Sequence, residues 1–143
     1  MSLLIPSDLL LRMREEAASA FPEECCGLLI GEPGPDDRIE VRDLVPAANV
    51  APDRRRHFEL DPAVHLRWQQ TLRGTGRSVV GHYHSHPGGR AEPSLVDIKS
   101  ISDPAVIWVI VTAESDTDIG DVRAWRVKDD VSGFQDIPIL DDG

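Results

Sequence analysis

The chain has 143 residues, of which 41% are hydrophobic and 28% are charged. This composition is typical of an ordinary globular protein with a proper core, and we expect one domain covering residues 1–143. Acidic residues outnumber basic residues by 25 to 15, and the net charge of −10 argues against a nucleic-acid-binding protein, which needs a basic surface along the phosphates.

The sequence also argues against a membrane or secreted protein. No apolar run approaches the ~20 residues that cross a bilayer. The first residues lack a basic leader followed by a long apolar segment, so we expect a cytoplasmic location. The two cysteines, Cys25 and Cys26, are neighbours. Because a disulfide between adjacent residues is strained, we expect reduced thiols that serve as small core residues, with a catalytic thiol as the less favoured alternative.

A helix and a β-hairpin are predicted for the first part of the chain. Ser7 can cap a helix that runs to about residue 21. Its apolar stripe consists of Leu10, Met13, Ala17 and Ala20. Residues 25–31 form a short apolar strand, residues 32–37 are rich in turn formers, and residues 39–45 alternate like a return strand.

A loop and a second helix follow. Residues 46–56 are predicted to be an exposed loop, and residues 57–60 a short strand. The loop contains three consecutive arginines, Arg54, Arg55 and Arg56. A solvated stretch is their simplest interpretation, and a clamp for an acidic partner or a carboxylate is the alternative. Asp61 followed by proline is typical of a helix start, and Gly74 of its end. The inward stripe of this helix consists of Val64, Trp68 and Leu72.

The rest of the chain is predicted to hold four strands and a third helix. Residues 77–86 form a strand, and Ser94 begins a helix that runs to about residue 102. This helix is expected to bury Leu95, Ile98 and Ile101. Residues 105–111 are almost continuously apolar, as in a central strand covered on both faces. Residues 121–127 alternate, and residues 134–140 are predicted to add a last edge strand. Helices and strands therefore interleave around a mixed sheet, with helices on both of its sides.

Three of the five histidines lie at alternate positions of the strand predicted at residues 77–86. They are His82, His84 and His86. Because alternate side chains of a strand point to one face, the three imidazoles form a row on one side. Pro87 and two glycines then end the strand. Ser94 begins the next helix, and Asp97, three residues on, lies on the same helical face.

Imidazoles and a carboxylate are the ligands of catalytic zinc sites, which use three protein groups and leave the fourth tetrahedral position for water. Bound zinc lowers the pKa of that water from 15.7 to about 7 and so provides a nucleophile at neutral pH. Two plainer interpretations exist. A histidine row can be the polar face of a half-buried sheet, and Ser94 with Asp97 also forms a capping box at a helix start.

At these residues the sequence resembles the JAMM (MPN-domain) metalloproteases. The similarity consists of His84-Ser85-His86-Pro87 followed by Ser94-x-x-Asp97. The family also has a catalytic glutamate far upstream, often within Pro-x-Glu-x-Cys-Gly. The matching segment here is Pro22-Glu23-Glu24-Cys25-Cys26-Gly27. It is therefore Glu24, and not Glu23, that occupies the position of the family glutamate.

The resemblance implies one zinc ion bound by His84, His86 and Asp97. It implies that Glu24 takes the proton from the metal-bound water and passes it to the leaving amine, and that Ser94 hydrogen-bonds the oxyanion of the tetrahedral intermediate. The family often has a bulky apolar or aromatic residue where this chain has His82. We therefore expect His82 to have a packing role or to act from outside the ligand shell.

The resemblance also implies a three-layer α/β/α fold with a mixed sheet, related in outline to the cytidine deaminases. Members that cut ubiquitin chains carry long insertions, for which 143 residues leave little room, so the chain is more similar to the short prokaryotic members. The implied activity is hydrolysis of the amide after the C-terminal Gly-Gly of a small ubiquitin-like or sulfur-carrier protein. No nucleic-acid or membrane partner is expected, and the oligomeric state stays open.

Two other functions fit parts of the sequence. A non-catalytic MPN-type scaffold or interaction domain is the main alternative, but such domains have lost metal ligands, whereas every ligand position is filled here. A deaminase needs a His-x-Glu and a Cys-x-x-Cys, and the adjacent Cys25 and Cys26 have the wrong spacing.

Overall fold

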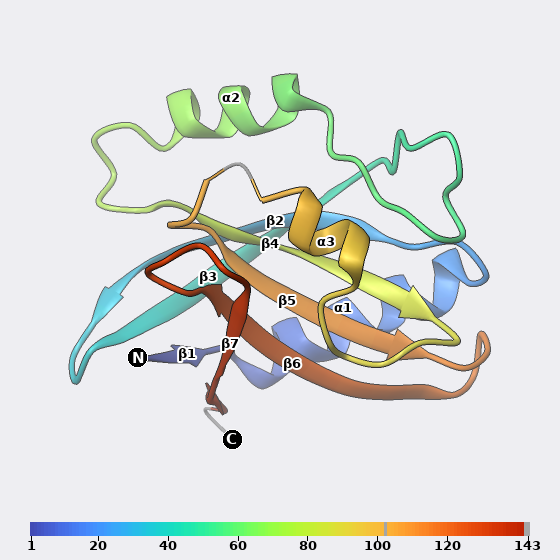
Figure 1. The fold of residues 1–143 in the computed structure, drawn as a ribbon. Helices are drawn as coiled ribbons and strands as arrows, with labels where there is room; N and C mark the ends of the chain where they lie inside the picture. The colour runs from blue at the N-terminus through green and yellow to red at the C-terminus, as the bar shows by residue number, and fades with distance from the viewer. Residues whose placement is uncertain (102, 142–143) are drawn as a thin grey trace.

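A computed structural model describes residues 1–101 and 103–141, which form an eight-stranded mixed sheet and three helices (Figure 1). The strands are β1 (Ser2–Leu4), β2 (Cys26–Gly34), β3 (Arg38–Ala47), β4 (Ser78–Pro87), β5 (Ile107–Ala113), β6 (Ile119–Val127), β7 (Phe134–Ile137) and β8 (Ile139–Leu140). The helices are α1 (Ser7–Ala20), α2 (Pro62–Thr71) and α3 (Leu95–Lys99). None of the described helices is long and apolar enough to cross a membrane.

The strand order is β7-β6-β5-β4-β2-β3-β1-β8, which places β4 in the interior of the sheet. This strand pairs antiparallel with β2 and parallel with β5, and α3 lies on the crossover that a parallel pair requires. All residues of β5 are buried, which confirms the predicted central strand. The histidine-bearing strand predicted at residues 77–86 is likewise confirmed as β4.

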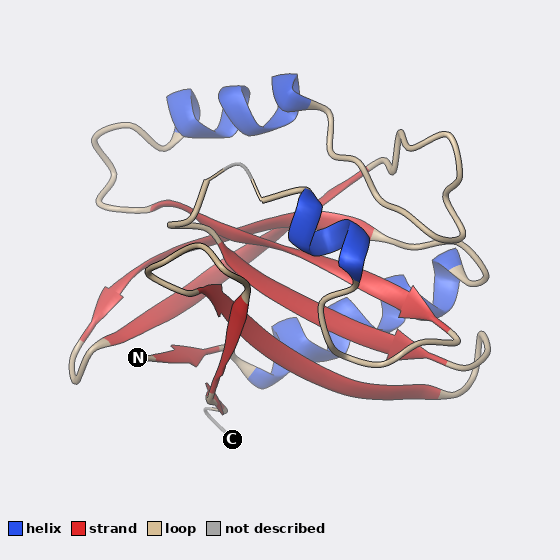
Figure 2. Cartoon of the chain, viewed as in Figure 1, coloured by secondary structure: helices blue, strands red, loops and turns tan. Residues whose placement is uncertain are grey.

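Helices cover both faces of the sheet, as Figures 1 and 2 show. Helix α1 packs against β5 and β6 and buries Leu9, Met13 and Ala17, whereas α2 lies on the opposite side and contacts β4. The three-layer α/β/α arrangement is therefore confirmed. The stripe predicted for α1 needs correction, because Leu9 rather than Leu10 is buried and Ala20 is only half-buried. Positions 9, 13 and 17 follow the helical repeat more closely.

The alternation of side chains along β4 separates a core face from a polar face. Tyr83 is fully buried on the α1 side, where its hydroxyl donates to Glu16 of α1 (2.7 Å). A Cβ atom at Gly27, the register partner of Tyr83 on β2, would overlap the tyrosine ring, which explains the glycine of the upstream motif. The three histidines of β4 point to the opposite face, which carries α2 and α3.

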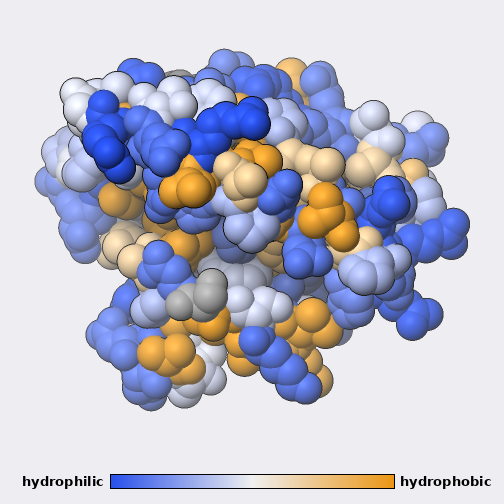
Figure 3. Space-filling model, turned by 90° about the horizontal axis from the view of Figure 1, so that it is seen from above, coloured by the Kyte–Doolittle hydropathy of each residue, from blue (hydrophilic) through white to orange (hydrophobic). Residues whose placement is uncertain are grey.

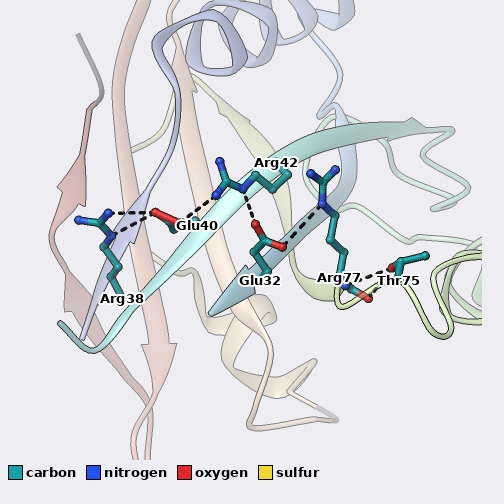
Figure 4. Close-up of polar contacts among 6 residues, drawn as sticks. All are labelled: Glu32, Arg38, Glu40, Arg42, Thr75 and Arg77. Atoms are coloured by element: carbon teal, nitrogen blue, oxygen red, sulfur yellow. Dashed lines mark hydrogen bonds and ion pairs between the residues drawn. The ribbon is translucent and has the colours of Figure 1, made fainter. Parts of the chain in front are cut away.

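Charged side chains join β2 and β3 near the turn of their hairpin (Figure 4). Glu40 accepts hydrogen bonds from Arg38 (3.0 Å) and Arg42 (2.9 Å). Glu32 accepts another from Arg42 (2.8 Å), and its carboxylate lies 3.8 Å from Nε of Arg77, just before β4. The opposite charges alternate along this row, and both strands extend beyond their predicted ends.

The two ends of the chain differ from the prediction. Strand β1 has three residues, too few for a periodic signal, and it pairs in parallel with β3 and β8. The single edge strand predicted at residues 134–140 is wrong, because Pro138 has no N–H and separates β7, which pairs with β6, from β8, which pairs with β1. Since β7 and β8 are the two edges of the sheet, one short segment forms both edges.

The middle of the chain is less regular than predicted. The strand expected at residues 57–60 is reduced to an isolated bridge between Leu60 and Asn49. Helix α2 begins after Asp61 as expected and ends at Thr71, before the predicted end. Its expected inward residues, Val64, Trp68 and Leu72, are only half-buried. Helix α3 begins after Ser94 as expected and ends at Lys99, and the predicted end at residue 102 lies outside the described residues.

Candidate active site

Two imidazoles of β4 meet on the face of the sheet opposite α1. His84 Nε2 lies 2.9 Å from His86 Nε2. His84 is fully buried, and its ring stacks on that of Phe58 with centroids 4.1 Å apart. His86 Nδ1 lies 2.7 Å from the carbonyl oxygen of Arg90. Because a carbonyl only accepts, Nδ1 donates to it, and Nε2 is the ring nitrogen that faces His84 and Asp97.

Asp97 of α3 reaches both imidazoles. Its Oδ2 atom lies 3.2 Å from His86 Nε2 and 3.4 Å from His84 Nε2. The same oxygen accepts the backbone N–H of Ser94 (2.8 Å), and Ser94 Oγ accepts the backbone N–H of Asp97 (3.1 Å). The expected capping box and the contact with the histidines are therefore both present, and the cap fixes the carboxylate against the imidazole pair.

A second carboxylate, that of Glu24, lies beside the pair. One of its oxygens and the ring nitrogens of His84 and His86 lie within 4.8 Å of one another, and only 5% of Glu24 is exposed. Strand pairing explains this approach across the sequence, because Cys26 at the start of β2 is the register partner of His84. The structure thus brings the glutamate of the upstream motif to the histidines of the downstream motif.

His82 lies apart from the cluster formed by Glu24, His84, His86 and Asp97. Its ring packs edge-on against Trp108, with centroids 4.3 Å apart, and at 5.4 Å from Phe58. Its Nδ1 atom is buried without a hydrogen-bond partner among the described residues. Burial lowers the pKa of His82 to about 3, so the ring is neutral. This is the environment of a packing residue, and Phe58, which contacts His82, links it to His84.

The donor atoms suit a tetrahedral zinc shell. Zinc bonds of about 2.0–2.2 Å place tetrahedral ligand atoms roughly 3.3–3.6 Å apart. The separations among His84, His86 and Asp97 are 2.9, 3.2 and 3.4 Å, so the three atoms converge slightly more closely than in a filled shell. Glu24 is close enough to contact a water in the fourth position.

The pKa values of the Glu24 and Asp97 carboxyl groups are shifted in opposite directions. Burial raises the pKa of Glu24 to about 8; His86 opposes this shift, and the negative charges of Asp97 and Asp53 add to it. Burial also disfavours ionised Asp97, but hydrogen bonds from His84 and His86 outweigh it and hold the pKa of Asp97 well below its usual range. Asp97 is therefore a permanent anion, whereas Glu24 is able to exchange a proton near neutral pH.

The two histidines also differ. Burial lowers the pKa of His84, although the hydrogen bond to Asp97 opposes it, and the ring is neutral, which is the form that binds metals. Burial lowers the pKa of His86 as well, but hydrogen bonds to Asp97 and to the Arg90 carbonyl outweigh it, so this pKa is raised. A metal ion at the cluster competes directly with that proton.

The cysteines do not supply a nucleophile. Both are free thiols, as expected, with Cys26 buried and Cys25 half-buried. Burial raises the pKa of Cys25 to about 11 and that of Cys26 to about 12, so both are protonated at neutral pH. Since the thiolate is the reactive form, these residues serve packing.

A groove of about 600 Å³ adjoins the cluster. Phe58, His82 and Trp108 line its wall, and the acidic side chain of Glu59 lies at the same groove. Phe58 lies between the groove and the cluster, because its ring also stacks on that of His84. The groove is therefore partly aromatic and partly acidic.

The apolar side of α3 is exposed, which contradicts the predicted burial of Leu95 and Ile98. Leu95 is 75% exposed and Ile98 is 38% exposed. This short helix faces the cluster through Asp97, its one fully buried residue, so its apolar side chains are left at the surface. Figure 3 shows apolar groups exposed among charged ones on the face that carries α2. Ser94, at the rim of the cluster, is also exposed. The three arginines at 54–56 are exposed as well, as in the predicted solvated loop.

Three further residues, whose roles the sequence does not indicate, support the site. Phe58 stacks on His84, Ser85 Oγ accepts the backbone N–H of Cys25, and Asn49 Nδ2 donates to the carbonyl of Glu24 (3.0 Å). An asparagine in a loop indicates a turn, but no pattern in the sequence indicates a contact 25 residues away.

Comparison with known proteins identifies a matching family and several similar proteins. Residues 6–128 match the family described as prokaryotic homologs of the JAB domain. The chain is 35% identical over 101 residues to a desampylase from Haloferax volcanii, across 71% of this chain and 70% of that protein. It is 31% identical over 127 residues to a CysO-cysteine peptidase from Mycobacterium tuberculosis, across 89% and 84%. A probable TtuB-protein conjugate cleaving protease from Thermus thermophilus is 36% identical over 97 residues, across 68% and 62%.

Solved structures agree with this placement. A solution structure of a protein from Desulfitobacterium hafniense aligns with a TM-score of 0.82 and 29% identity, over 99% of this chain and 92% of that one. A crystal structure of a JAB1/MPN domain protein from Archaeoglobus fulgidus aligns with a TM-score of 0.58 and 20% identity, over 98% and 99%, and supports the fold alone. Fold, motifs and sequence similarity agree, and the chain belongs to the prokaryotic JAB family of the JAMM (MPN-domain) proteins.

Proposed function

We propose that this protein is a zinc-dependent peptidase or isopeptidase that hydrolyses the amide bond after the C-terminal Gly-Gly of a small ubiquitin-like or sulfur-carrier protein. The observation that carries the proposal is the convergence of His84, His86 and Asp97 beside the buried Glu24. Similarity to a desampylase, a CysO-cysteine peptidase and a probable TtuB-protein conjugate cleaving protease supports the class of reaction and of substrate.

The proposed zinc ligands are His84, His86 and Asp97. When bound, zinc supplies a Lewis acid for the carbonyl and lowers the pKa of the attacking water. Two of these ligands are also hydrogen-bonded to backbone groups, His86 to the Arg90 carbonyl and Asp97 to the N–H of Ser94. Such contacts fix the orientation and tautomer of a metal ligand.

Glu24 is the proposed general base and acid. It accepts a proton from the water as the water oxygen bonds to the carbonyl carbon. It then delivers that proton to the amine nitrogen as the carbon–nitrogen bond breaks, so that a carboxylic acid and a free amine leave and Glu24 is ready for the next turnover. A pKa raised by burial toward neutrality suits a group that must first take a proton and then release it.

Ser94 is the proposed donor to the oxyanion. Its Oγ accepts the backbone N–H of Asp97, which orients the hydroxyl and leaves its own proton for another acceptor. Because Ser94 is exposed at the rim of the cluster, a substrate carbonyl oxygen can reach it. A donor of this kind stabilises the charge that develops on the carbonyl oxygen during attack.

The groove and α3 are the proposed contact surface for the carrier protein. An extended Gly-Gly tail has no side chains and suits a groove whose lining includes the contacting rings of Phe58 and Trp108. The exposed Leu95 and Val96 of α3 offer an apolar surface beside the cluster for the folded part of the carrier.

The substitution Glu24→Gln tests the proposal. Wild-type protein with zinc is expected to release a Gly-Gly-ending carrier from a conjugate, as seen by mass spectrometry, and a chelator should stop the reaction until zinc is restored. Glu24→Gln should lower kcat by about 10²–10⁴-fold while one zinc ion remains bound. Wild-type turnover by Glu24→Gln would reject the role of Glu24, and the absence of stoichiometric zinc would favour a non-catalytic scaffold.

The setting of this activity follows from two further points. The free thiols Cys25 and Cys26 support a reducing compartment, and we place the enzyme in the cytoplasm. We propose that residues 1–143 act as one domain, because the cluster draws on α3, β4 and the segment before β2 within a single sheet.

A further inference from the structure

The side chain of Asn49, in the loop after β3, binds four backbone groups. Its Nδ2 donates to the carbonyls of Glu24 (3.0 Å) and His57 (2.9 Å). Its Oδ1 accepts the backbone N–H groups of Ala51 (3.0 Å) and Glu59 (3.1 Å). An asparagine amide has two donor hydrogens and two acceptor lone pairs, so this amide is fully used.

Glu24 depends on this loop because it lies just outside the sheet. Strand β2 begins at Cys26, and the backbone bonds to β4 extend only as far as Cys25. The backbone N–H of Glu24 donates to the carbonyl of Arg54 (2.7 Å), and the carbonyl of Glu24 accepts from Asn49. Both backbone polar groups of Glu24 are therefore bound by residues 49–54 and not by a neighbouring strand.

We propose that Asn49 is a positioning residue for Glu24. Its bond to the Glu24 carbonyl fixes the peptide from which the carboxylate extends, and its bond to the His57 carbonyl fixes the residue next to Phe58, whose ring stacks on His84. One amide thus sets the distance between the base and the imidazole pair. This inference rests on the proposed function, because it assigns Glu24 as the base.

The four bonds separate into a local pair and a distant pair. The bond from Ala51 to Oδ1 closes an Asx turn and shapes only the loop. The bond from Nδ2 to Glu24 crosses 25 residues and contributes nothing to that turn. Asn49→Asp has nearly the same shape, keeps both accepting bonds and loses both donating bonds. Asn49→Ala loses all four but adds no charge near Glu24.

The test is steady-state hydrolysis of a Gly-Gly conjugate by zinc-loaded protein, together with thermal unfolding and zinc content. Asn49→Asp should fold and bind one zinc ion per chain, with kcat lowered about 10- to 100-fold at unchanged KM. Asn49→Ala should lose at least as much, which separates misplacement from added charge. In the Glu24→Gln background, Asn49→Asp should change the residual rate by less than about twofold, because no base is left to position.

Thr75→Ala is the matched control. Thr75 Oγ also bonds backbone on both sides of a loop, to the Leu72 carbonyl (2.6 Å) and from the Arg77 N–H (3.1 Å), at the end of β4 that lies away from the cluster. Its kcat should match that of the wild type.

Three results would overturn the inference. Wild-type kcat in Asn49→Asp, with Glu24→Gln inactive, removes the positioning role and leaves the proposed function intact. A loss of kcat that only follows lost zinc or a lower folded fraction, or that is equally large in the Glu24→Gln background, assigns Asn49 to stability alone. Full activity of Glu24→Gln itself removes the proposed function and this inference together.

Discussion

The hydroxyl oxygen of Ser85 accepts a hydrogen bond from the backbone N–H of Cys25, 60 residues earlier, across 2.8 Å. The backbone N–H of Ser85 returns a bond to the Cys25 carbonyl (3.1 Å). Ser85 lies between the two cluster histidines of β4 but points to the other face, and Cys25 directly follows Glu24. This pair of bonds holds the two halves of the motif at a fixed separation.

Ser85→Ala should destabilise the protein by about 1–3 kcal/mol, because it removes the acceptor of a backbone N–H group in the interior. Ser85 is fully buried, so water does not replace the lost oxygen. Urea denaturation measures the loss of stability. The value of kcat should fall as well, because Cys25, next to Glu24, is held less firmly. Ser78→Ala, at the exposed start of the same strand, should change stability by less than about 0.5 kcal/mol. Equal stabilities for the two variants would contradict the account.

Glu24 should make the stability of metal-free protein depend on pH. Its pKa is raised from 4.5 to about 8, so the folded state holds a proton that the unfolded chain releases. The stability contributed by that proton is complete below about pH 4.5 and is lost as the pH rises through about 8. Glu24→Gln stays neutral, so it should gain on the wild type between pH 5 and pH 8 by on the order of a few kcal/mol. Denaturation in the presence of a chelator measures this gain, and a constant difference between the proteins would refute it.

Ser94→Ala and Asp97→Ala remove opposite halves of one capping box. Ser94→Ala should keep one zinc ion, lose about 1 kcal/mol of stability with the cap, and lower kcat about 10²–10³-fold with the oxyanion donor. Asp97→Ala should lose zinc as well, because a ligand disappears. Metal content measured on purified protein separates the two. Full zinc occupancy in Asp97→Ala would show that Glu24 is the third ligand instead.

His82→Phe should bind one zinc ion and be at least as stable as the wild type. The phenyl ring keeps the packing against Trp108 and Phe58. It also removes Nδ1, a buried nitrogen without a partner among the described residues, whose desolvation is uncompensated. Zinc titration and thermal unfolding measure both properties. A large loss of zinc affinity would place His82 among the ligands.

Leu95→Asp should raise the KM for conjugates while leaving kcat and stability unchanged. Leu95 is 75% exposed, so the folded protein loses little packing, but the proposed apolar contact with the carrier is replaced by a charge. Leu11→Asp is a matched control, because Leu11 is 57% exposed on α1, on the other face of the sheet. An equal rise in KM for both variants would indicate a general charge effect.

The parts of the fold that the sequence predicts are those with a repeating physical signal. An almost continuous apolar run predicts β5, and the alternate histidines predict the polar face of β4. The capping pair predicts the start of α3. Strand β1 escapes prediction because three residues carry no period, and its stability comes from pairing with β3 and β8. The apolar face of α3 is misread because burial depends on what lies opposite, which the residues of the helix do not encode.

The candidate site divides in the same way. Residue type and spacing indicate His84, His86 and Asp97, the resemblance to the JAMM motif indicates Glu24, and the structure brings the four together. The support from Asn49 is invisible in the sequence, because its contact with Glu24 depends on how a loop without regular structure folds back over the start of β2.

The position of Pro138 affects where local unfolding of the sheet begins. With β7 and β8 on either side of it, the two rims of the sheet share one stretch of chain, and the histidine strand lies three strands in from one rim and four from the other. Fraying begins where strands have a single neighbour. The candidate site thus lies on the innermost part of the sheet, and we expect it to stay intact when β7 or β8 frays.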